Sequence, residues 1–404
     1  MYLQEPNLQE SSTKPRVCIV TTSFPRWMED DQGTFVLEVA KALTNQGAFV
    51  RVIGPHAPGA SRREDMYGID VIRPRYAWPE RFEILRRYRA GLPVILRKTN
   101  ASWLLLPLFI LSQWITLLRY SRDCDVIHAN WTLSAFSGVL VKLFRKIPVV
   151  VTVQGSDIYE TLRIGWLQWV TRAVLIRVDQ VIALSSSLAE LARDIGIPEE
   201  RIRVIPNGVD VEYFIPPEDE KDPLILFVGS IIERKGVHHL INAAPKIFQE
   251  LPDYKLILIG DGPIEEQLKI RSEEMGLQEH IRFLGVKSPS DVRHWMQKSK
   301  LFVLPSLEEG LGVVLLEALA CATPCVGSDV GGIPDVINPD VGRLVPPGEP
   351  DQLADAITGI LRDPGLWKAL HQRSRDYIVN NFSWHKISIE LLALYQDLGR
   401  INAD

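Results

Sequence analysis

Residues 301–320 read LFVLPSLEEGLGVVLLEALA, and this stretch decides the fold. Its first four residues, 301–304, are apolar and predict a short buried strand, while the residues from Gly312 onward predict a helix. The loop between them contains Gly310 and Gly312. A strand, a glycine-containing loop and a helix in succession form the repeating unit of a parallel α/β sheet, which binds ligands at the carboxyl ends of its strands. We therefore predict functional residues in this loop.

The same alternation of apolar runs and helix-length stretches continues along the chain. Strands are predicted at 17–22, 48–53, 126–129, 149–153, 181–184 and 204–205, and then at 224–228, 255–259, 281–284, 301–304 and 324–326. Helical patterns separate them, such as residues 34–46 ahead of Gly47. Short strands joined by helices predict parallel sheets covered on both faces, and hence an α/β fold.

A proline-rich and acidic linker divides the chain near residues 215–223. Pro216-Pro217 is followed by the charged run 218–222 and by Pro223. With 404 residues the chain is long enough for two domains. We predict an N-terminal domain at 1–215, a C-terminal domain at 216–381, and a C-terminal helix at 382–404 that packs back on the N-terminal domain.

Composition and charge exclude several classes of protein. Apolar residues are 46% of the chain and charged residues 24%, which excludes a disordered or collagen-like chain. The net charge of −5 argues against binding to nucleic acid through a basic surface. The halves differ, because residues 1–215 hold 26 Lys and Arg against 22 Asp and Glu, and the remainder holds 19 against 28.

The cysteines and the N-terminus favour a cytosolic protein. Cys18, Cys124, Cys321 and Cys325 form no CxxC pair, so neither a zinc site nor a disulfide framework is expected. Residues 1–14 are polar and do not resemble a secretory signal. Asp123-Cys124-Asp125 mimics an Asp-x-Asp metal motif but precedes a strand instead of following one. We therefore predict no metal site.

Residues 101–118 are uncharged and lie at the lower limit of the about 20 residues that span a bilayer. Pro107, Gln113 and other polar residues within them favour a buried or interfacial helix. Six basic groups precede this segment: Arg81, Arg86, Arg87, Arg89, Arg97 and Lys98. Two interpretations remain open. The basic groups either contact the anionic inner face of a membrane or are solvated beside a buried helix.

Two glutamates accompany the glycine loop. Glu309 lies within the loop, and Glu317 lies one to two turns into the following helix. Free backbone N–H groups at the start of that helix predict an anion-binding site, and a carboxylate at Glu317 can accept hydrogen bonds from a diol such as ribose. Gly33, at the entrance of the helix that follows the first strand, predicts a second close approach of backbone to ligand.

The spacing of Glu309 and Glu317 resembles the Glu-x7-Glu motif of family-four glycosyltransferases. Other matching pieces follow in family order over nearly the whole chain: Phe24-Pro25, Gly33-Thr34-Phe35, Asp125-Val126-Ile127-His128-Ala129, Thr152 with Gly155-Ser156-Asp157, Pro206-Asn207-Gly208-Val209-Asp210, Val228-Gly229 with Lys235-Gly236, Gly260-Asp261-Gly262-Pro263, Phe283-Leu284-Gly285 and Gly331-Gly332-Ile333-Pro334. The resemblance implies the GT-B fold, in which two Rossmann-like doubly wound domains face an interdomain cleft.

The resemblance also implies an activity. Family members are generally retaining enzymes that transfer a sugar from a nucleotide-diphosphate sugar, often described as front-face substitution without a settled protein nucleophile. We expect a retaining, metal-independent transferase with no cofactor beyond this co-substrate. Its acceptor would be a carbohydrate or a lipid-linked sugar in surface polysaccharide or glycolipid synthesis.

Roles for individual residues follow from the same resemblance. Lys235 and Glu309 are the implied catalytic residues, with Lys235 on the phosphates and Glu309 on the sugar hydroxyls. Glu317 would bind the ribose. The remaining donor-binding residues would be Gly33, Arg234, Gly310, Leu311, Gly312 and Val313. On the acceptor side stand Gln154 and Asp157, and Asp157 is equally well interpreted as a helix N-cap.

Two positions depart from the family pattern. Ser230 stands where the family usually has arginine, and Gln154 stands where it often has histidine. Arg234 is a candidate replacement for the missing arginine charge. The departures keep two alternatives open: a non-catalytic subunit that binds a nucleotide sugar, and a sugar epimerase of the same fold.

Overall fold

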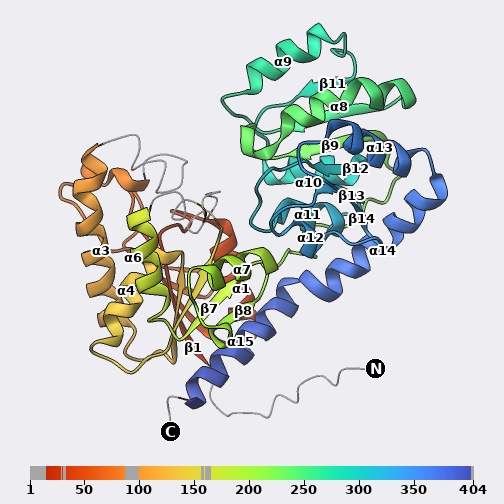
Figure 1. Cartoon of the computed structure of the whole chain (residues 1–404). Coiled ribbons are helices and arrows are strands. Elements are labelled where there is room, and N and C mark those ends of the chain that lie inside the picture. Colours follow the sequence, from red (N-terminus) through yellow and green to blue (C-terminus); the bar gives the residue numbers. More distant parts are fainter. Residues whose placement is uncertain are drawn as a thin grey trace, which may run out of the picture. The chain divides into compact units, whose positions relative to one another are not determined.

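The computed structural model describes residues 15–28, 30, 33–86, 100–155, 159 and 165–401. The chain divides into two compact units (Figure 1). Unit 1 comprises Met1–Thr152, Ala173–Val181 and Ser388–Asp404, and unit 2 comprises Val153–Arg172 and Ile182–Ile387. The α/β fold class is confirmed, because each of two sheets consists mainly of parallel strands with helices between them. The domain boundaries expected from the sequence, at 1–215, 216–381 and 382–404, stay a prediction.

The first sheet is built around the N-terminal strand. Its strands are β1 (Arg16–Thr21), β2 (Phe49–Ile53), β3 (Arg63–Met66), β4 (Ile69–Ile72), β5 (Val126–Asn130), β6 (Val149–Val153), β7 (Gln180–Ala183) and β8 (Ile202–Val204). Within the described residues their order is β3-β4-β2-β1-β5-β6-β7-β8. β1 pairs in parallel with β2 and β5, whereas β3 and β4 form an antiparallel hairpin. All five residues of β6 are buried, as expected for a central parallel strand.

The second sheet is parallel throughout. Its strands are β9 (Asp222–Val228), β10 (Lys255–Ile259), β11 (Ile281–Phe283), β12 (Ser299–Leu304), β13 (Cys325–Ser328) and β14 (Gly342–Val345). The order in the described chain is β11-β10-β9-β12-β13-β14. The direction of winding therefore reverses between β9 and β12, which are neighbours. The loops after these two strands meet at the switch point, where open α/β sheets bind ligands.

Helices fill the connections between strands. Those before the linker are α1 (Thr34–Asn45), α3 (Asn100–Tyr120), α4 (Thr132–Lys142), α6 (Gly165–Leu175) and α7 (Ser186–Asp194). Those after it are α8 (Val237–Glu250), α9 (Glu265–Glu274), α10 (Pro289–Lys298), α11 (Val313–Ala320), α12 (Ile333–Val336), α13 (Pro350–Leu361), α14 (Pro364–Phe382) and α15 (Trp384–Ile401). Single 3-10 turns are η1 (Glu80–Phe82), η2 (Ile84–Arg86), η3 (Glu199–Arg201) and η4 (Glu233–Lys235).

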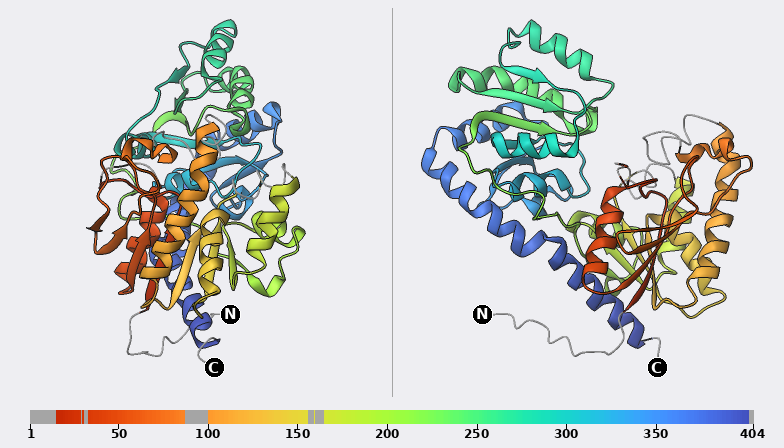
Figure 2. Two further views of the ribbon diagram at one scale, coloured as in Figure 1. Left: turned by 90° about the vertical axis from the view of Figure 1, so that its left-hand side faces the viewer. Right: turned by 180° about the vertical axis from the view of Figure 1, so that it is seen from behind.

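In unit 2, α8 packs beside α13, and α10 packs beside α11 (Figure 2). Right-handed crossovers place these two pairs on opposite faces of the sheet.

The structure has elements that the sequence analysis did not predict. The hairpin β3–β4 turns at Tyr67 and Gly68, whose φ angles are 57° and 79°. β3 reads REDM and has a single buried residue, so it lacks the alternation that marks a strand. β14 is equally short, and it follows a turn that contains Asn338.

The uncharged segment forms α3, and its two faces differ. Phe109, Gln113 and Leu117 are buried, whereas the opposite face exposes large apolar side chains. Of the two predicted alternatives, a buried or an interfacial helix, a wholly buried helix does not fit the exposed outer face. Within the described residues α3 supplies one window, Trp103–Tyr120, that is long and apolar enough to cross a membrane. Of the six preceding basic groups, only the side chain of Arg81 lies within the described residues.

A buried hydrogen-bond chain joins α15 to the first sheet. The hydroxyl of Tyr395 lies 2.7 Å from Nδ1 of His128, and Nε2 of His128 lies 2.7 Å from the hydroxyl of Thr152. Burial lowers the pKa of His128 to about 4, so its ring is neutral at pH 7. Each nitrogen of the neutral His128 ring has a hydrogen-bond partner, and the bond to Tyr395 holds the C-terminal helix α15 against β5.

We expect Tyr395→Phe to destabilise the protein by about 1–3 kcal/mol, because it leaves a buried ring nitrogen of His128 without its partner. Urea unfolding measures the effect. Tyr67→Phe is the matched control, because the side chain of Tyr67 is 49% exposed, and its change should stay within about 0.5 kcal/mol. Equal stability of the two variants would contradict the role of the Tyr395–His128 contact.

Candidate functional site

The loop 305–312 joins β12 to α11 and is held on one side by η4. The N–H of Leu307 donates to the carbonyl oxygen of Arg234 at 2.8 Å. Gly236, which follows η4, has φ +64°, and a Cβ added there would lie 1.9 Å from the carbonyl oxygen of Pro305. Any larger residue would force η4 and the loop apart. The close backbone approach thus fixes Lys235 relative to the loop.

The other side of the loop rests on a pair of glycines before α12. A Cβ at Gly331 would lie 1.8 Å from the carbonyl oxygen of Glu309. The N–H of Gly332 donates to the same oxygen at 3.2 Å. The loop is therefore fixed from both sides by the backbone, and the position of the Glu309 side chain is set with it.

Lys235 and Glu309 form an ion pair. Nζ of Lys235 lies 2.5 Å from Oε2 of Glu309, and the side chains are 18% and 13% exposed. The hydroxyl of Ser306 donates to Oε2 at 3.3 Å, and the N–H of Gly310 donates to Oε1 at 3.2 Å. Because an ammonium group has three donors, Lys235 can bind an anion while it keeps this pair. The structure thus brings together the two residues predicted to be catalytic. Ser306 lies in the predicted loop, but no sequence pattern marked it as a site residue.

The N-terminus of α11 opens beside this pair. In the part of the chain that the structure describes, the N–H groups of Leu311, Gly312 and Val313 have no hydrogen-bond partner. Unpaired N–H groups and the helix dipole give this end a partial positive charge. Together with Lys235 they form an arrangement that favours phosphate groups.

Glu317 lies in the second turn of α11. Its carboxylate has no hydrogen-bond or ion-pair partner among the described residues, and the side chain is only partly exposed. Burial raises the pKa of Glu317 to about 7. A carboxyl group that is desolvated but unpaired is typical of a ligand site, because a ligand can supply the missing hydrogen bonds.

The other residues predicted for the site take no part in the Lys235–Glu309 ion pair. The guanidinium of Arg234 is exposed and unpaired within the described chain, and Ser230 is exposed just after β9. Gly33 caps α1 in unit 1, whereas Lys235, Glu309 and Glu317 all lie in unit 2. Gln154 follows β6 and is partly buried. Asp157 lies outside the described residues.

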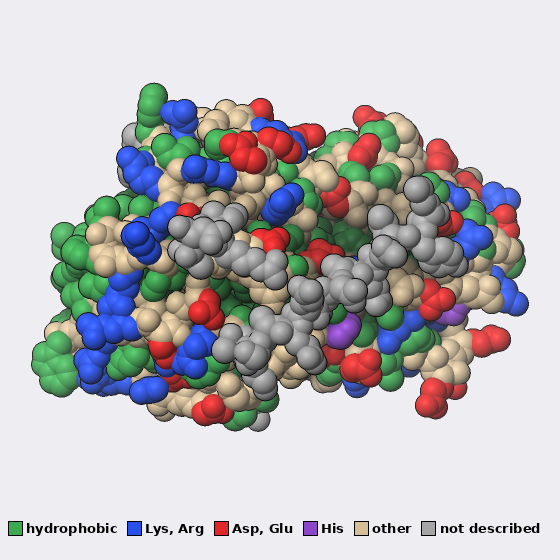
Figure 3. Space-filling model, turned by 90° about the horizontal axis from the view of Figure 1, so that it is seen from below, with side chains coloured by type: hydrophobic (Ala, Val, Ile, Leu, Met, Phe, Trp, Pro, Cys, Tyr) green, Lys and Arg blue, Asp and Glu red, His purple; other side chains and the backbone are tan. Residues whose placement is uncertain are grey.

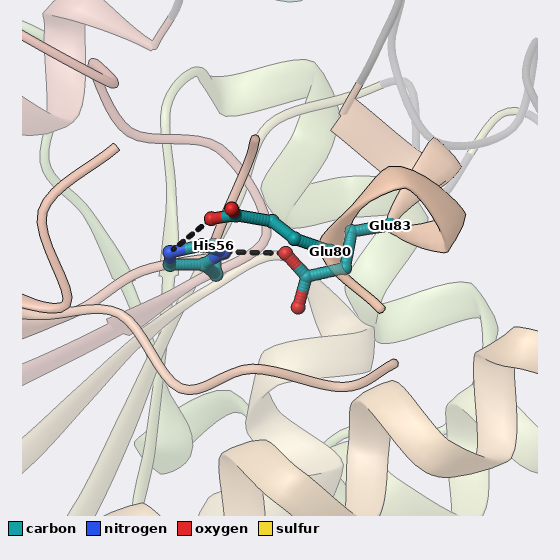
Figure 4. Close-up of side chains that lie close together, drawn as sticks. All are labelled: His56, Glu80 and Glu83. Carbon is teal, nitrogen blue, oxygen red and sulfur yellow. Dashed lines mark hydrogen bonds and ion pairs between the residues drawn. The ribbon is translucent and has the colours of Figure 1, made fainter. Parts of the chain in front are cut away.

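One cluster with metal-ligand chemistry occurs among the described residues, in unit 1. His56, Glu80 and Glu83 place their ligand atoms within 4.8 Å of one another (Figure 4). Nδ1 of His56 hydrogen-bonds with Glu83, and Nε2 lies 3.0 Å from the carbonyl oxygen of Ala60 and 3.5 Å from Oε1 of Glu80. Both ring nitrogens are engaged within the protein, so the cluster serves to tie η1 to the loop after β2. The expectation that the protein binds no metal stays a prediction.

Comparison with known families identifies the class. Residues 32–213 match the model described as Glycosyltransferase Family 4, and residues 210–377 match Glycosyl transferases group 1. An uncharacterised glycosyltransferase of Methanocaldococcus jannaschii is 30% identical over 67% of this chain and 75% of its own length. The chain belongs to the group 1 glycosyltransferases.

Two further comparisons extend over almost all of the chain. The phosphatidyl-myo-inositol mannosyltransferase of Mycolicibacterium smegmatis is 28% identical over 90% of this chain and 89% of its own. The structure of HepE from Anabaena in complex with UDP-glucose matches with a TM-score of 0.70 at 19% identity, covering 95% of this chain and 99% of that one. The fold is that of the GT-B glycosyltransferases, as the resemblance implied.

The raised pKa of Glu317 gives a test of its environment. In the folded protein the Glu317 carboxyl keeps its proton up to about pH 7, whereas in the unfolded chain it releases the proton at about pH 4.3. The stability that the protonated form contributes is therefore lost as pH rises between these values. Between pH 5 and 8 the free energy of unfolding should fall by about 1–3 kcal/mol more for wild type than for Glu317→Gln.

Urea unfolding at several pH values measures this difference. Glu266→Gln is the control, since Glu266 is an exposed residue of α9. Parallel pH profiles for wild type and Glu317→Gln would contradict a desolvated carboxyl at this position.

Proposed function

We propose that this chain is a retaining, metal-independent glycosyltransferase that uses a nucleoside-diphosphate sugar. The observation that carries the proposal is the Lys235–Glu309 pair beside the open N-terminus of α11, at the switch point of the second sheet. The acceptor is a carbohydrate or a lipid-linked sugar, in surface polysaccharide or glycolipid synthesis. The UDP-glucose complex of HepE supports the donor class, and the phosphatidyl-myo-inositol mannosyltransferase supports a lipid-linked acceptor.

The donor binds along the loop and α11. The ribose diol donates to the unpaired carboxylate of Glu317, which the desolvated setting of that group favours. The free N–H groups at the start of α11 and Nζ of Lys235 receive the diphosphate oxygens. The exposed Arg234 lies next in sequence to Lys235 and supplies the charge that Ser230 lacks.

In the transfer step the bond between the anomeric carbon and the diphosphate oxygen breaks. The electron pair leaves with the diphosphate, whose negative charge grows as the bond lengthens. Lys235 and the α11 N-terminus stabilise that charge in place of a metal ion. Glu309 accepts from donor-sugar hydroxyls and orients Lys235. The acceptor oxygen attacks from the face that the leaving group vacates, and its proton passes to the departing diphosphate.

A cytosolic location is part of the proposal. All four cysteines lie within the described residues as buried free thiols. Burial raises the pKa of Cys321 to about 12, which keeps this thiol protonated and unreactive. Buried thiols of this kind are typical of proteins in a reducing compartment.

Incubation of the protein with a panel of nucleotide sugars, selected by thermal shift, tests the proposal. Release of nucleoside diphosphate with transfer or hydrolysis of the sugar is expected. Binding without turnover would favour a non-catalytic subunit, and conversion of the sugar without transfer would favour an epimerase. Either of the last two results would contradict the transferase assignment.

We expect Lys235→Ala to lower kcat by about 100-fold while donor affinity changes much less, because the leaving-group charge is greatest in the transition state. Arg234→Ala should act in the same direction if its guanidinium replaces the missing family arginine. Lys269→Ala, in α9, removes a lysine that pairs with Glu265 and is the control for general charge loss. If steady-state kinetics show no effect of Lys235→Ala, the donor phosphates do not bind at Lys235.

A further inference from the structure

A groove of about 670 Å³ lies in unit 2 between α8 and α9. The two helices pack beside each other at the top of Figure 1 and in both views of Figure 2. The volume lies within the range of about 300–1,000 Å³ that is typical of small-molecule sites. Of the described residues that line the groove, none belongs to the donor site, so the proposed transfer reaction leaves the groove unused.

Two side-chain amides line the groove from opposite walls. Asn242 lies on α8 and Gln267 lies on α9, and both are exposed. Neither amide has a hydrogen-bond partner in the part of the chain that the structure describes. Each amide carries both donors and an acceptor. A hydroxyl group also donates and accepts, so a ligand with several hydroxyl groups can satisfy both side chains at once.

The charged side chains of the groove nearly balance. Nη1 of Arg271 lies 3.6 Å from Oε2 of Glu274, and Glu233 is the other charged residue of the described lining. Two carboxylates against one guanidinium disfavour a phosphate or another anion. The ligand atoms of His238, Glu233 and Glu274 do not all lie within 4.8 Å of one another, so a metal ion would have fewer than three protein ligands there. A neutral ligand therefore fits the groove better than an ion.

The C-terminal half of the chain carries a negative net charge. Residues 216–404 hold 19 Lys and Arg against 28 Asp and Glu. Figure 3 shows acidic and basic side chains mixed on its right, the side on which α8 to α14 lie in Figure 1, whereas basic side chains gather on its left. A surface of this kind does not attract an anionic ligand from a distance.

Apolar side chains form part of the same lining. Ile264 precedes α9, and Leu268 follows one turn later and is buried. The side chain of Ile270 is 51% exposed. A sugar ring presents hydroxyl groups at its rim and apolar C–H groups on its faces. A carbohydrate therefore matches the amides and the apolar side chains of this groove together.

The groove shares a structural element with the donor site. η4 begins at Glu233, which lines the groove, and ends at Lys235, which pairs with Glu309. Oε2 of Glu233 lies 3.4 Å from Nδ1 of His238, so these two side chains join η4 to α8 at one end of the groove. A ligand in the groove therefore contacts the turn that carries Lys235 without occupying the donor site.

We propose that this groove is a second carbohydrate-binding site, which holds a neutral oligosaccharide outside the donor site. The amides of Asn242 and Gln267 bind its hydroxyl groups, and the carboxylate of Glu233 accepts from another hydroxyl. The C–H faces of the sugar rings lie on Ile264 and Ile270. A glycan bound there stays tethered to the enzyme, which raises its effective concentration for transfer.

Calorimetry on the full chain tests the proposal without any sugar donor, so its result is independent of the proposed function. The probes are neutral trisaccharides of glucose, mannose, galactose and N-acetylglucosamine. At least one should bind wild type, and it should still bind when UDP is saturating, because the groove lies outside the donor site. Asn242→Ala/Gln267→Ala should weaken this binding by about 10-fold or more, since hydrogen bonds from both walls are lost.

The matched control is Gln249→Ala/Gln278→Ala, which removes two exposed amides of unit 2 outside the groove. It should retain the wild-type affinity. Glu233→Gln should stay within about 3-fold of wild type, because an amide oxygen also accepts from a hydroxyl group, whereas a cationic ligand would lose its counter-charge. Thermal unfolding of each variant verifies that it is folded.

Three results would overturn the proposal. The first is that no trisaccharide of the panel binds wild type. The second is equal affinity of the groove variant and the control, which places the bound sugar outside the groove. The third is binding of inorganic phosphate or of a divalent cation that Asn242→Ala/Gln267→Ala weakens while no trisaccharide competes, which assigns the groove to an ion.

Discussion

The contact of loop 305–312 with backbone on both sides is the constraint on which the site depends. At Gly236 and at Gly331 a single added carbon would collide with a carbonyl oxygen of the loop at under 2 Å. Side chains placed by such contacts have little freedom, because the backbone that carries them cannot shift. The ion pair of Lys235 and Glu309 and the open start of α11 follow from this placement. Reactive groups in a donor site need such fixed positions, since small misplacements cost much of the rate.

Electrostatics divides the site into two parts with different chemistry. Lys235 and the α11 N-terminus concentrate positive charge where a diphosphate binds, and Glu309 neutralises part of it before the donor arrives. Glu317 carries an unpaired carboxyl whose pKa burial raises to about 7. Desolvation of this group costs stability, which a ligand's hydroxyl groups would restore. The site is therefore less stable empty than occupied, as binding sites often are.

The sequence predicts the sheets and the loop because both rest on local patterns. Short apolar runs separated by helices indicate parallel strands, and the order of β9 and β12 brings Lys235 and Glu309 together from segments far apart in the chain. The hairpin β3–β4 could not be predicted, since the polar run REDM has no strand pattern. Which face of α3 is buried could not be predicted, because the segment is apolar all round.

Glu309→Ala, titrated with UDP and with UDP-glucose, tests the central claim most directly. If a different nucleotide stabilises the protein better than UDP, that nucleoside diphosphate and its sugar conjugate replace UDP and UDP-glucose. If Glu309 both pairs with Lys235 and holds the donor sugar, its loss frees Lys235 for phosphate and removes only the sugar contact. UDP should then bind as tightly as to wild type or more tightly, while UDP-glucose loses about 10–100-fold in affinity. An unchanged ratio of the two affinities would contradict the claim that this loop holds the sugar of the donor.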